Sequence, residues 1–224
     1  MSPEEQVSAL FSAGDAIGAP VVGDRAREAV AALRGYAYQV YATALAWTEL
    51  PPGAELHVEV AEDFAVAARG ALQAVQVKDQ AGSVTLASRE VRQCLDAFVK
   101  LVADNPARTA KMAFLTTAVV GLERSKASRP DDGPGLLYWR RVASGADGAG
   151  VGALRSALLQ LELADATKRF IHERSDERLR RELVQRVDWR CGEAPLADLA
   201  AQLEGRVAEL CADEFDIPID EGSR

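Results

Sequence analysis

The chain contains 224 residues, 48% of them hydrophobic and 27% charged, with a formal net charge of −8. This length allows one large domain, or a hydrophobic core with a helical appendage. The sequence has no run of about 18 apolar residues and begins without a basic and an apolar signal region, so we expect neither a membrane-spanning helix nor a signal peptide. Three scattered cysteines exclude a zinc-ribbon pattern and fit a reduced cytoplasm: Cys94, Cys191 and Cys211.

The negative charge is concentrated at the two ends of the chain. Residues 191–224 hold nine acids and two bases, and residues 1–24 hold four acids and no base. The segment between them carries 24 bases against 21 acids, a net charge of +3. A weakly basic middle is compatible with contacts to nucleic-acid phosphates but does not require them.

The first half of the chain has the pattern of a helix followed by a hairpin-rich sheet. Residues 1–25 are polar and read as a leader. Apolar residues at helical spacing predict a helix over 26–49, which Pro51-Pro52-Gly53 ends. Three short apolar runs then predict strands at about 55–61, 63–69 and 72–78.

A second helix and a further strand follow. Ser88 is placed to cap a helix whose apolar stripe includes Val91, Leu95 and Phe98. Residues 110–120 form a strand-like run, and residues 121–135 form a long loop. The predicted order is helix, three strands, helix, strand, which gives an α/β fold with a mixed sheet.

The rest of the chain is predicted to be helical. The amphipathic segments span residues 136–143, 151–174, 176–188 and 195–212. We therefore expect a core at 26–145, a helical region at 151–212, and a linker or tail at 213–224. A basic run in the helical region is compatible either with a DNA backbone track or with a solvated helical face, because acids are interspersed with it.

The residues that point to chemistry lie between positions 59 and 78. Side chains alternate between the two faces of a strand, so Gln76 and Lys78 share one face while Val75 and Val77 share the other. If the second and third strands pair as a hairpin, Asp63 comes close to both polar residues. A carboxylate, an amide oxygen and a lysine at one point of a sheet are what a metal-dependent phosphodiesterase needs.

This pattern resembles the PD-(D/E)xK nuclease superfamily, in the variant in which glutamine replaces the last acidic residue. Three motifs in order carry the resemblance: Arg34-Gly35-Tyr36-Ala37-Tyr38-Gln39, then Val58-Glu59-Val60-Ala61-Glu62-Asp63, then Val75-Gln76-Val77-Lys78-Asp79. The set is similar to the double-stranded-DNA endonuclease domain of bacterial anti-phage systems, which occurs in CBASS effectors and at the N-terminus of STAND-type NTPases. The resemblance covers roughly residues 26–120, and it implies the αβββαβ core of that superfamily.

The resemblance also implies roles for individual residues. Asp63, Gln76 and the carbonyl of Val77 would hold Mg²⁺ or Mn²⁺. Lys78 would stabilise charge on the scissile phosphate and help to orient the attacking water. Gln39, on the first helix, would stand beside the metal ligands. Because a neutral amide is a weaker ligand than a carboxylate, Gln76 puts a second metal ion in doubt.

Glu59 and Glu62 compete for the role of second carboxylate. In an unbroken strand Glu59 and Asp63 share a face, whereas Glu62 has the opposite parity, and this favours Glu59. A bulge or turn near Ala61 would reverse the choice. Both residues therefore stay in the candidate site.

The sequence predicts a cytoplasmic, Mg²⁺-dependent endonuclease acting on double-stranded DNA, as an effector of antiviral defence. Cutting a duplex needs two active sites, so a homo-oligomer is expected, and no membrane is expected to take part. Any NTPase or sensor domain would follow Arg224, because the chain contains no phosphate-binding GxxxxGK motif. The alternative is a catalytically inactive nuclease fold that serves as an interaction or oligomerisation module.

Overall fold

The computed structural model describes residues 29–59, 62–146 and 150–214. The chain divides into two compact units, residues 1–33 and 34–224. Only residues 29–33 of the first unit are described, and they begin helix α2 (Ala29–Thr48). The expected leader at 1–25, and residues 215–224 of the expected tail, lie outside the described residues.

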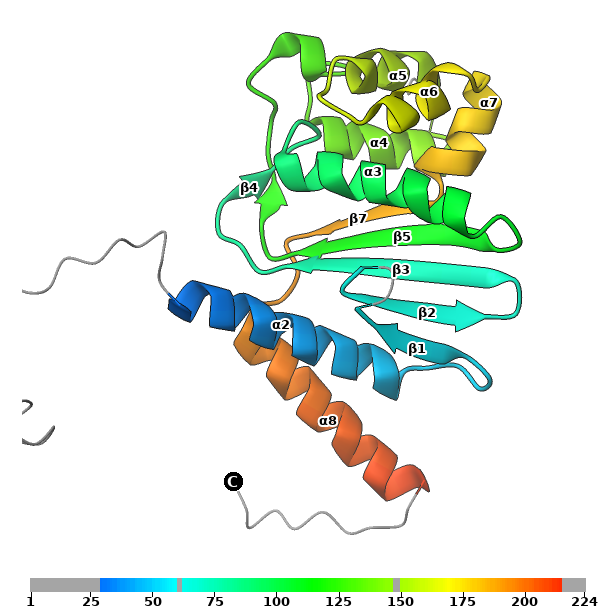
Figure 1. Ribbon diagram of the computed structural model, residues 1–224. Coiled ribbons are helices and arrows are strands. Elements are labelled where there is room, and N and C mark those ends of the chain that lie inside the picture. Colours follow the sequence, from blue (N-terminus) through cyan, green and yellow to red (C-terminus); the bar gives the residue numbers. More distant parts are fainter. Residues whose placement is uncertain (1–28, 60–61, 147–149, 215–224) are drawn as a thin grey trace, which may run out of the picture. The chain divides into compact units, whose positions relative to one another are not determined.

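A five-stranded mixed sheet forms the centre of the second unit (Figure 1). Strands β1, β2 and β3 are antiparallel neighbours, and β3, β5 and β7 are parallel neighbours. The expected α/β class and mixed sheet are confirmed. The strand bounds, in the order in which the strands lie in the sheet, are β1 Glu55–Val58, β2 Phe64–Ala68, β3 Ala71–Lys78, β5 Thr109–Thr116 and β7 Val187–Cys191.

Helices cover both faces of this sheet (Figure 1). Helix α3 (Arg89–Asp104) crosses from β3 to β5 and buries the expected stripe, including Val91, Leu95 and Phe98. On the opposite face, α2 and α8 (Leu196–Glu214) share a smaller core with the strands, to which Tyr38, Phe64 and Leu199 belong. Up to β5, the chain therefore follows the expected order of helix, three strands, helix and strand.

The start of α3 differs in detail from the expected cap. Ser88 precedes the helix with an extended backbone, but its hydroxyl accepts no hydrogen bond from the first helical turn. Instead, Ser88 Oγ accepts the backbone N–H of Thr85 at 2.9 Å. The serine thus closes the loop before the helix. That loop includes β4 (Ser83–Val84), which pairs in parallel with β6 (Val119–Val120).

Shorter helices pack on the α3 side and share one core with it. Trp139 anchors this layer, because its ring contacts Trp189 of β7 edge-on at 5.4 Å and its Nε1–H donates to the carbonyl of Val184 at 3.0 Å. None of the described helices is long and apolar enough to span a membrane. The elements of this layer are α4 Gly135–Ser144, α5 Val151–Leu159, α6 Asp165–His172, α7 Asp176–Leu179 and a π-helical turn, η3 Arg180–Val184.

Two expectations for the C-terminal half were wrong. The single helix expected over 151–174 is two helices, α5 and α6. The helix expected over 176–188 ends with η3, and β7 follows, so the region is not entirely helical. In β7, buried Val187 and Trp189 alternate with exposed Asp188 and Arg190, which is the two-residue period of a strand. The strand expected over 110–120 ends at Thr116.

Glu123 shows how the fold satisfies a buried charge. It lies in the loop before a 3-10 turn, η2 (Lys126–Ser128), and is 1% exposed. Its carboxylate accepts the backbone N–H of Leu86 at 2.8 Å and that of Gly135 at 3.0 Å. The carboxylate therefore joins the loop before α3 to the first turn of α4, where a negative charge is favoured.

We predict that Gly135→Ala destabilises the protein by about 1–3 kcal/mol, the usual cost of overpacking. A Cβ at this position would lie 2.7 Å from Glu123 Oε1 and 3.0 Å from Leu86 Cβ. The matched control is Gly205→Ala in α8, where an added Cβ meets nothing within 4 Å and helix propensity favours alanine. Chemical denaturation of both variants tests this. Equal midpoints for the parent and Gly135→Ala would contradict it.

Candidate functional site

The carboxylate of Asp63 joins three elements at one end of the sheet. Asp63 directly precedes β2. Its Oδ1 accepts a hydrogen bond from Gln39 Nε2 of α2 at 2.8 Å, and its Oδ2 accepts the backbone N–H of Val77 of β3 at 2.5 Å. Because Phe64 pairs with Val75, the next antiparallel position sets Asp63 opposite Gln76. The hairpin therefore sets Asp63 opposite Gln76 in backbone register, and Gln39 contacts Asp63 from the helix.

Gln76 and Lys78 lie on the α3 side of β3. Leu72 and Ala74 belong to the core shared with α3, whereas Val75 and Val77 belong to the core shared with α2. The alternation along the strand puts Gln76 and Lys78 on the face of Leu72 and Ala74. Gln76 is buried, at 8% exposure, and Lys78 at the strand end is half-buried.

The amide oxygen of Gln76 is buried without a hydrogen-bond partner in the described part of the chain. Leaving such an acceptor unsatisfied costs about 1–3 kcal/mol. The other buried side-chain atoms without partners there are all N–H donors: Arg92 Nε, Arg180 Nε and Trp189 Nε1. Gln76 Oε1 is thus the one acceptor among them, and an acceptor is the kind of atom that a bound cation satisfies.

A turn, not a continuous strand, separates the two candidate carboxylates. Strand β1 ends at Val58 and β2 begins at Phe64. Glu59 has a left-handed backbone, with φ of 56°, and its N–H donates to the Asp63 carbonyl at 3.1 Å. The unbroken strand on which the preference for Glu59 depended is therefore absent, and its parity argument does not apply.

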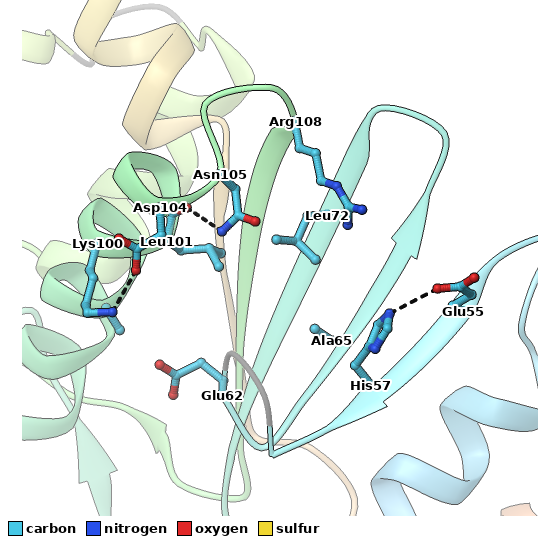
Figure 2. A pocket seen from close by; sticks show the side chains of 11 residues that line it. Glu55, His57, Glu62, Ala65, Leu72, Lys100, Leu101, Asp104, Asn105 and Arg108 are labelled. Atoms are coloured by element: carbon cyan, nitrogen blue, oxygen red, sulfur yellow. Dashed lines mark hydrogen bonds and ion pairs between the residues drawn. The ribbon is translucent and has the colours of Figure 1, made fainter.

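The turn sends Glu59 and Glu62 to opposite sides of the hairpin. Glu59 lines an apolar groove beside α2, together with Tyr36 and Val58. Glu62 lines a cleft between α3 and strands β1 and β2, as Figure 2 shows. Since Gln76 and Lys78 also face α3, Glu62 lies on their side of the sheet and Glu59 does not.

Electrostatics support the proximity of Glu62 to this group. Burial raises the pKa of the Glu62 carboxyl, the neighbouring Asp63 charge raises it further, and Lys78 opposes both. Burial also raises the pKa of the Cys94 thiol on α3, with a contribution from Glu62. Glu62 therefore lies between the end of the hairpin and α3, within the field of both Asp63 and Lys78.

The cleft that Glu62 enters has a volume of about 510 Å³. Glu62 lies toward one end of it and Arg108 toward the other (Figure 2). Within it, Lys100 is paired with Asp104 at 2.7 Å, and His57 Nε2 lies 3.3 Å from the Glu55 carboxylate. The cleft is therefore mixed in charge and does not by itself form a basic channel.

The ligand set at this end of the sheet fits a hard cation better than zinc. No group of three or more His, Cys, Asp or Glu side chains able to hold a metal occurs in the part of the chain that the structure describes. The site offers two carboxylates, Glu62 and Asp63, with the amide oxygen of Gln76 and the carbonyl of Val77. Mg²⁺ keeps several waters and needs only one or two carboxylates, so it tolerates such a set.

Sequence reasoning missed a second polar contact between α2 and β3. Arg34 Nε lies 2.7 Å from Asp79 Oδ2, and Thr117 Oγ1 donates to Asp79 Oδ1 at 2.9 Å. The only sequence signal was position, because Asp79 directly follows Lys78 and Arg34 begins the helical motif.

The two tyrosines of the helical motif differ in their environments. Tyr38 is buried, and its hydroxyl donates to the carbonyl of Ala194 at 3.0 Å. Burial raises the pKa of this hydroxyl, as do the nearby charges of Glu193 and Asp79. Tyr36 is 60% exposed.

Part of the basic run in the helical region is paired with acids of that region. Arg174 and Arg178 approach Glu182 at 2.9 and 3.0 Å. Burial alone would raise the pKa of Glu182, but hydrogen bonds from Arg178, Arg174 and Arg181 hold it at about 2. These three arginines therefore form a salt-bridged helical face around Glu182.

The chain matches no model of a known protein family, no curated protein and no solved structure. The resemblance to PD-(D/E)xK nucleases thus depends on the motif residues and on their arrangement.

We predict that Glu62→Gln raises the unfolding midpoint of the metal-free protein near neutral pH. A raised carboxyl pKa means that the fold disfavours the ionised form, so Glu62 lowers stability as pH rises through its titration. The amide removes that charge. Thermal melts in EDTA at pH 7.5 and at about pH 4 test this. At the lower pH a carboxyl with a raised pKa is mostly protonated.

The midpoints of parent and variant should converge at the lower pH. Glu204→Gln on the exposed face of α8 is the control, and it should leave the midpoint unchanged at both values. A Glu62→Gln midpoint below that of the parent near neutral pH would show that the carboxylate is a structural contact.

Proposed function

We propose that the chain is a metal-dependent DNA endonuclease domain of the PD-(D/E)xK superfamily, of the type used as an effector in bacterial anti-phage defence. The reaction would be hydrolysis of a phosphodiester bond of double-stranded DNA in the cytoplasm. The arrangement of α2, the β1–β2–β3 meander, α3 and β5 supports this, because it has the element order of that superfamily's αβββαβ core.

The observation that carries the proposal is the oxygen of Gln76, which has no hydrogen-bond partner among the residues that the structure describes. It is buried one strand away from Asp63 and two residues from Lys78, at the position where the superfamily has an acidic metal ligand. A fold that only needed to pack would gain stability by replacing this amide with an apolar residue. A metal ligand explains why an unsatisfied acceptor is kept there.

Each of the chain's own groups has a distinct task in this proposal. Asp63, Glu62 and Gln76, with the Val77 carbonyl, would hold Mg²⁺ or Mn²⁺. A bound cation of this kind polarises a phosphoryl oxygen and lowers the pKa of a bound water. The hydrogen bond from Gln39 and that from the Val77 N–H fix the orientation of the Asp63 carboxylate, so it needs little reorganisation.

Lys78 supplies the positively charged side chain of the proposed site. Its ammonium group lies within the field of Glu62 and follows Gln76 on the same face of β3. In the proposed reaction it stabilises the negative charge that develops on the scissile phosphate and orients the attacking water. Glu62 is the favoured second carboxylate, because Glu59 lines the groove on the other side of the hairpin.

The proposed partners are double-stranded DNA and further copies of the chain. One site cuts one strand, so a break in both strands of a duplex needs two sites. Clustering of several copies is therefore the proposed way in which cleavage is switched on. A sensor or NTPase domain that drives clustering would lie beyond the sequence given.

A second candidate function is an inactive nuclease fold that acts as an interaction module. One observation favours it: α2 and β1 present an apolar groove with Trp47 at 67% exposure and Tyr36 at 60%. An exposed apolar patch of this kind is typical of a protein-binding surface. The two candidates differ in metal binding, because an inactive module needs no cation at Asp63.

We predict that the chain cuts plasmid DNA only with Mg²⁺ or Mn²⁺, and more strongly as its concentration rises. The carboxylates of Glu62 and Asp63 repel a DNA phosphate, so a metal cation must neutralise them before the phosphate can bind. Incubation with metal or EDTA over a range of protein concentrations tests this. Cleavage that persists in EDTA would refute the metal mechanism, and no cleavage at any concentration would favour the interaction module.

We predict that Asp63→Asn and Lys78→Ala each reduce cleavage at least about a hundredfold, since loss of such a contact costs on the order of 3 kcal/mol. Only Asp63→Asn should weaken Mn²⁺ binding, because Lys78 is not a ligand. Asparagine is preferable to alanine at 63, since its amide oxygen can still accept the Val77 N–H, whereas truncation would break both hydrogen bonds of the carboxylate.

Calorimetric Mn²⁺ titration, nuclease assays and thermal melts of both variants make this comparison. Lys100→Ala is the matched control for the lysine, because Lys100 is exposed and paired with Asp104 outside the site. An Asp63→Asn variant that binds Mn²⁺ and cuts like the parent would show that the site is assigned to the wrong residues.

A further inference from the structure

Arg34 is held in one orientation by a buried carboxylate. Asp79 is 7% exposed, and it receives Arg34 Nε at 2.7 Å and Arg34 Nη2 at 3.4 Å. Thr117 Oγ1 donates to the same carboxylate at 2.9 Å, so Asp79 is itself fixed by β5 and its following turn. The guanidinium plane of Arg34 is therefore set by a side chain that cannot turn freely.

Most of the hydrogen-bonding capacity of Arg34 remains unused by this contact. A guanidinium has five N–H donors, and Asp79 engages Nε and one side of Nη2. The Arg34 side chain is 56% exposed although its partner is buried. The free edge of the guanidinium thus faces solvent, in a geometry that suits a phosphate.

Arg34 stands on the helix that also contacts Asp63 of the candidate metal site. Asp79 directly follows Lys78, and Arg34 precedes Gln39, the partner of Asp63, by five residues on the same helix. Five residues correspond to about 7.5 Å along a helix axis. A DNA strand advances about 3.4 Å per nucleotide, so this axial spacing corresponds to about two nucleotides.

We propose that Arg34 is a binding site for a backbone phosphate next to the scissile one. The inference rests on the proposed nuclease function and adds a substrate contact to it. The end of the sheet carries the neighbouring carboxylates of Glu62 and Asp63, and Asp79 directly follows Lys78, so a polyanion needs fixed cations there. Lys78 serves the reacting phosphate, and Arg34 holds the strand beside it.

A purely structural role for Arg34 makes a different prediction. If Arg34 only neutralises Asp79, then Arg34→Gln is harmful because it leaves a buried charge unpaired. The double variant Arg34→Gln with Asp79→Asn removes both charges, and it should then recover DNA binding and cleavage. If Arg34 binds phosphate, the double variant should remain defective even where its stability is restored.

The experiment measures binding of a short fluorescent duplex to the full chain between 50 and 200 mM salt. Each variant is made in a Lys78→Ala background so that the duplex stays uncut. Loss of one phosphate contact reduces the slope of log K against log salt by about one and weakens binding about tenfold. We expect this for Arg34→Gln and for the double variant. Arg206→Gln is the matched control, since Arg206 is also half-exposed and paired, with Glu209 at 3.0 Å, and it should keep the parental slope.

Cleavage by the same substitutions with Lys78 intact completes the test. Reduced cleavage with unchanged Mn²⁺ affinity supports a substrate contact. A parental salt slope in Arg34→Gln, or recovery of binding and cleavage in the double variant, would overturn the inference while leaving the nuclease proposal in place. A parent chain that neither binds the duplex nor cuts it with Mn²⁺ would instead refute the proposed function, and the phosphate site with it.

Discussion

The hydrogen bonds to Asp63 are the interaction on which the candidate site depends. The pairing of β2 with β3 stops at the Phe64–Val75 pair, and beyond it the N–H of Val77 would be left without a strand partner. The Asp63 carboxylate accepts it and extends the pairing by one step, using its other oxygen for Gln39. A single side chain therefore sets the spacing between the hairpin end, β3 and α2. These hydrogen bonds therefore also set the positions of the other side chains of the candidate site.

Departures from ordinary packing rules gather around this carboxylate. Glu59 adopts a left-handed backbone that non-glycine residues rarely use, Glu62 keeps a carboxyl that burial disfavours when charged, and Gln76 buries an unsatisfied oxygen. Glu123 provides the contrast, because the same fold buries it more completely and supplies backbone donors to its carboxylate. The chain can satisfy a buried acid, so the costs at the hairpin end call for a functional reason.

Much of the fold was predictable from local periodicity, and the failures have physical causes. Helix α3 buries Val91, Leu95 and Phe98 because a strong 3.6-residue stripe leaves little choice of face. Strand β7 was missed because it is only five residues long and directly follows helical turns. The alternation of Val187 and Trp189 with Asp188 and Arg190 was a visible signal. Competing helical periodicity obscured it.

The backbone register at the candidate site was predictable, but the placement of its side chains was not. Pairing of Asp63 with the strand of Gln76 and Lys78 followed from a hairpin about Gly70, since antiparallel register fixes opposite residues. The choice between Glu59 and Glu62 could not follow, because strand parity fails once a turn intervenes. The Arg34–Asp79 contact spans 45 residues and depends on how α2 docks, which no local pattern encodes.

These two contacts of α2 suggest how stability and function are linked in this chain. Arg34 and Gln39 attach the helix to the end of the sheet at Asp79 and Asp63, on either side of Val77 and Lys78. The outer face of the same helix carries exposed Tyr36 and Trp47. Any partner that binds this outer face and shifts α2 would move both polar contacts at once. The helix is therefore the element through which association of the chain could change the geometry at Asp63.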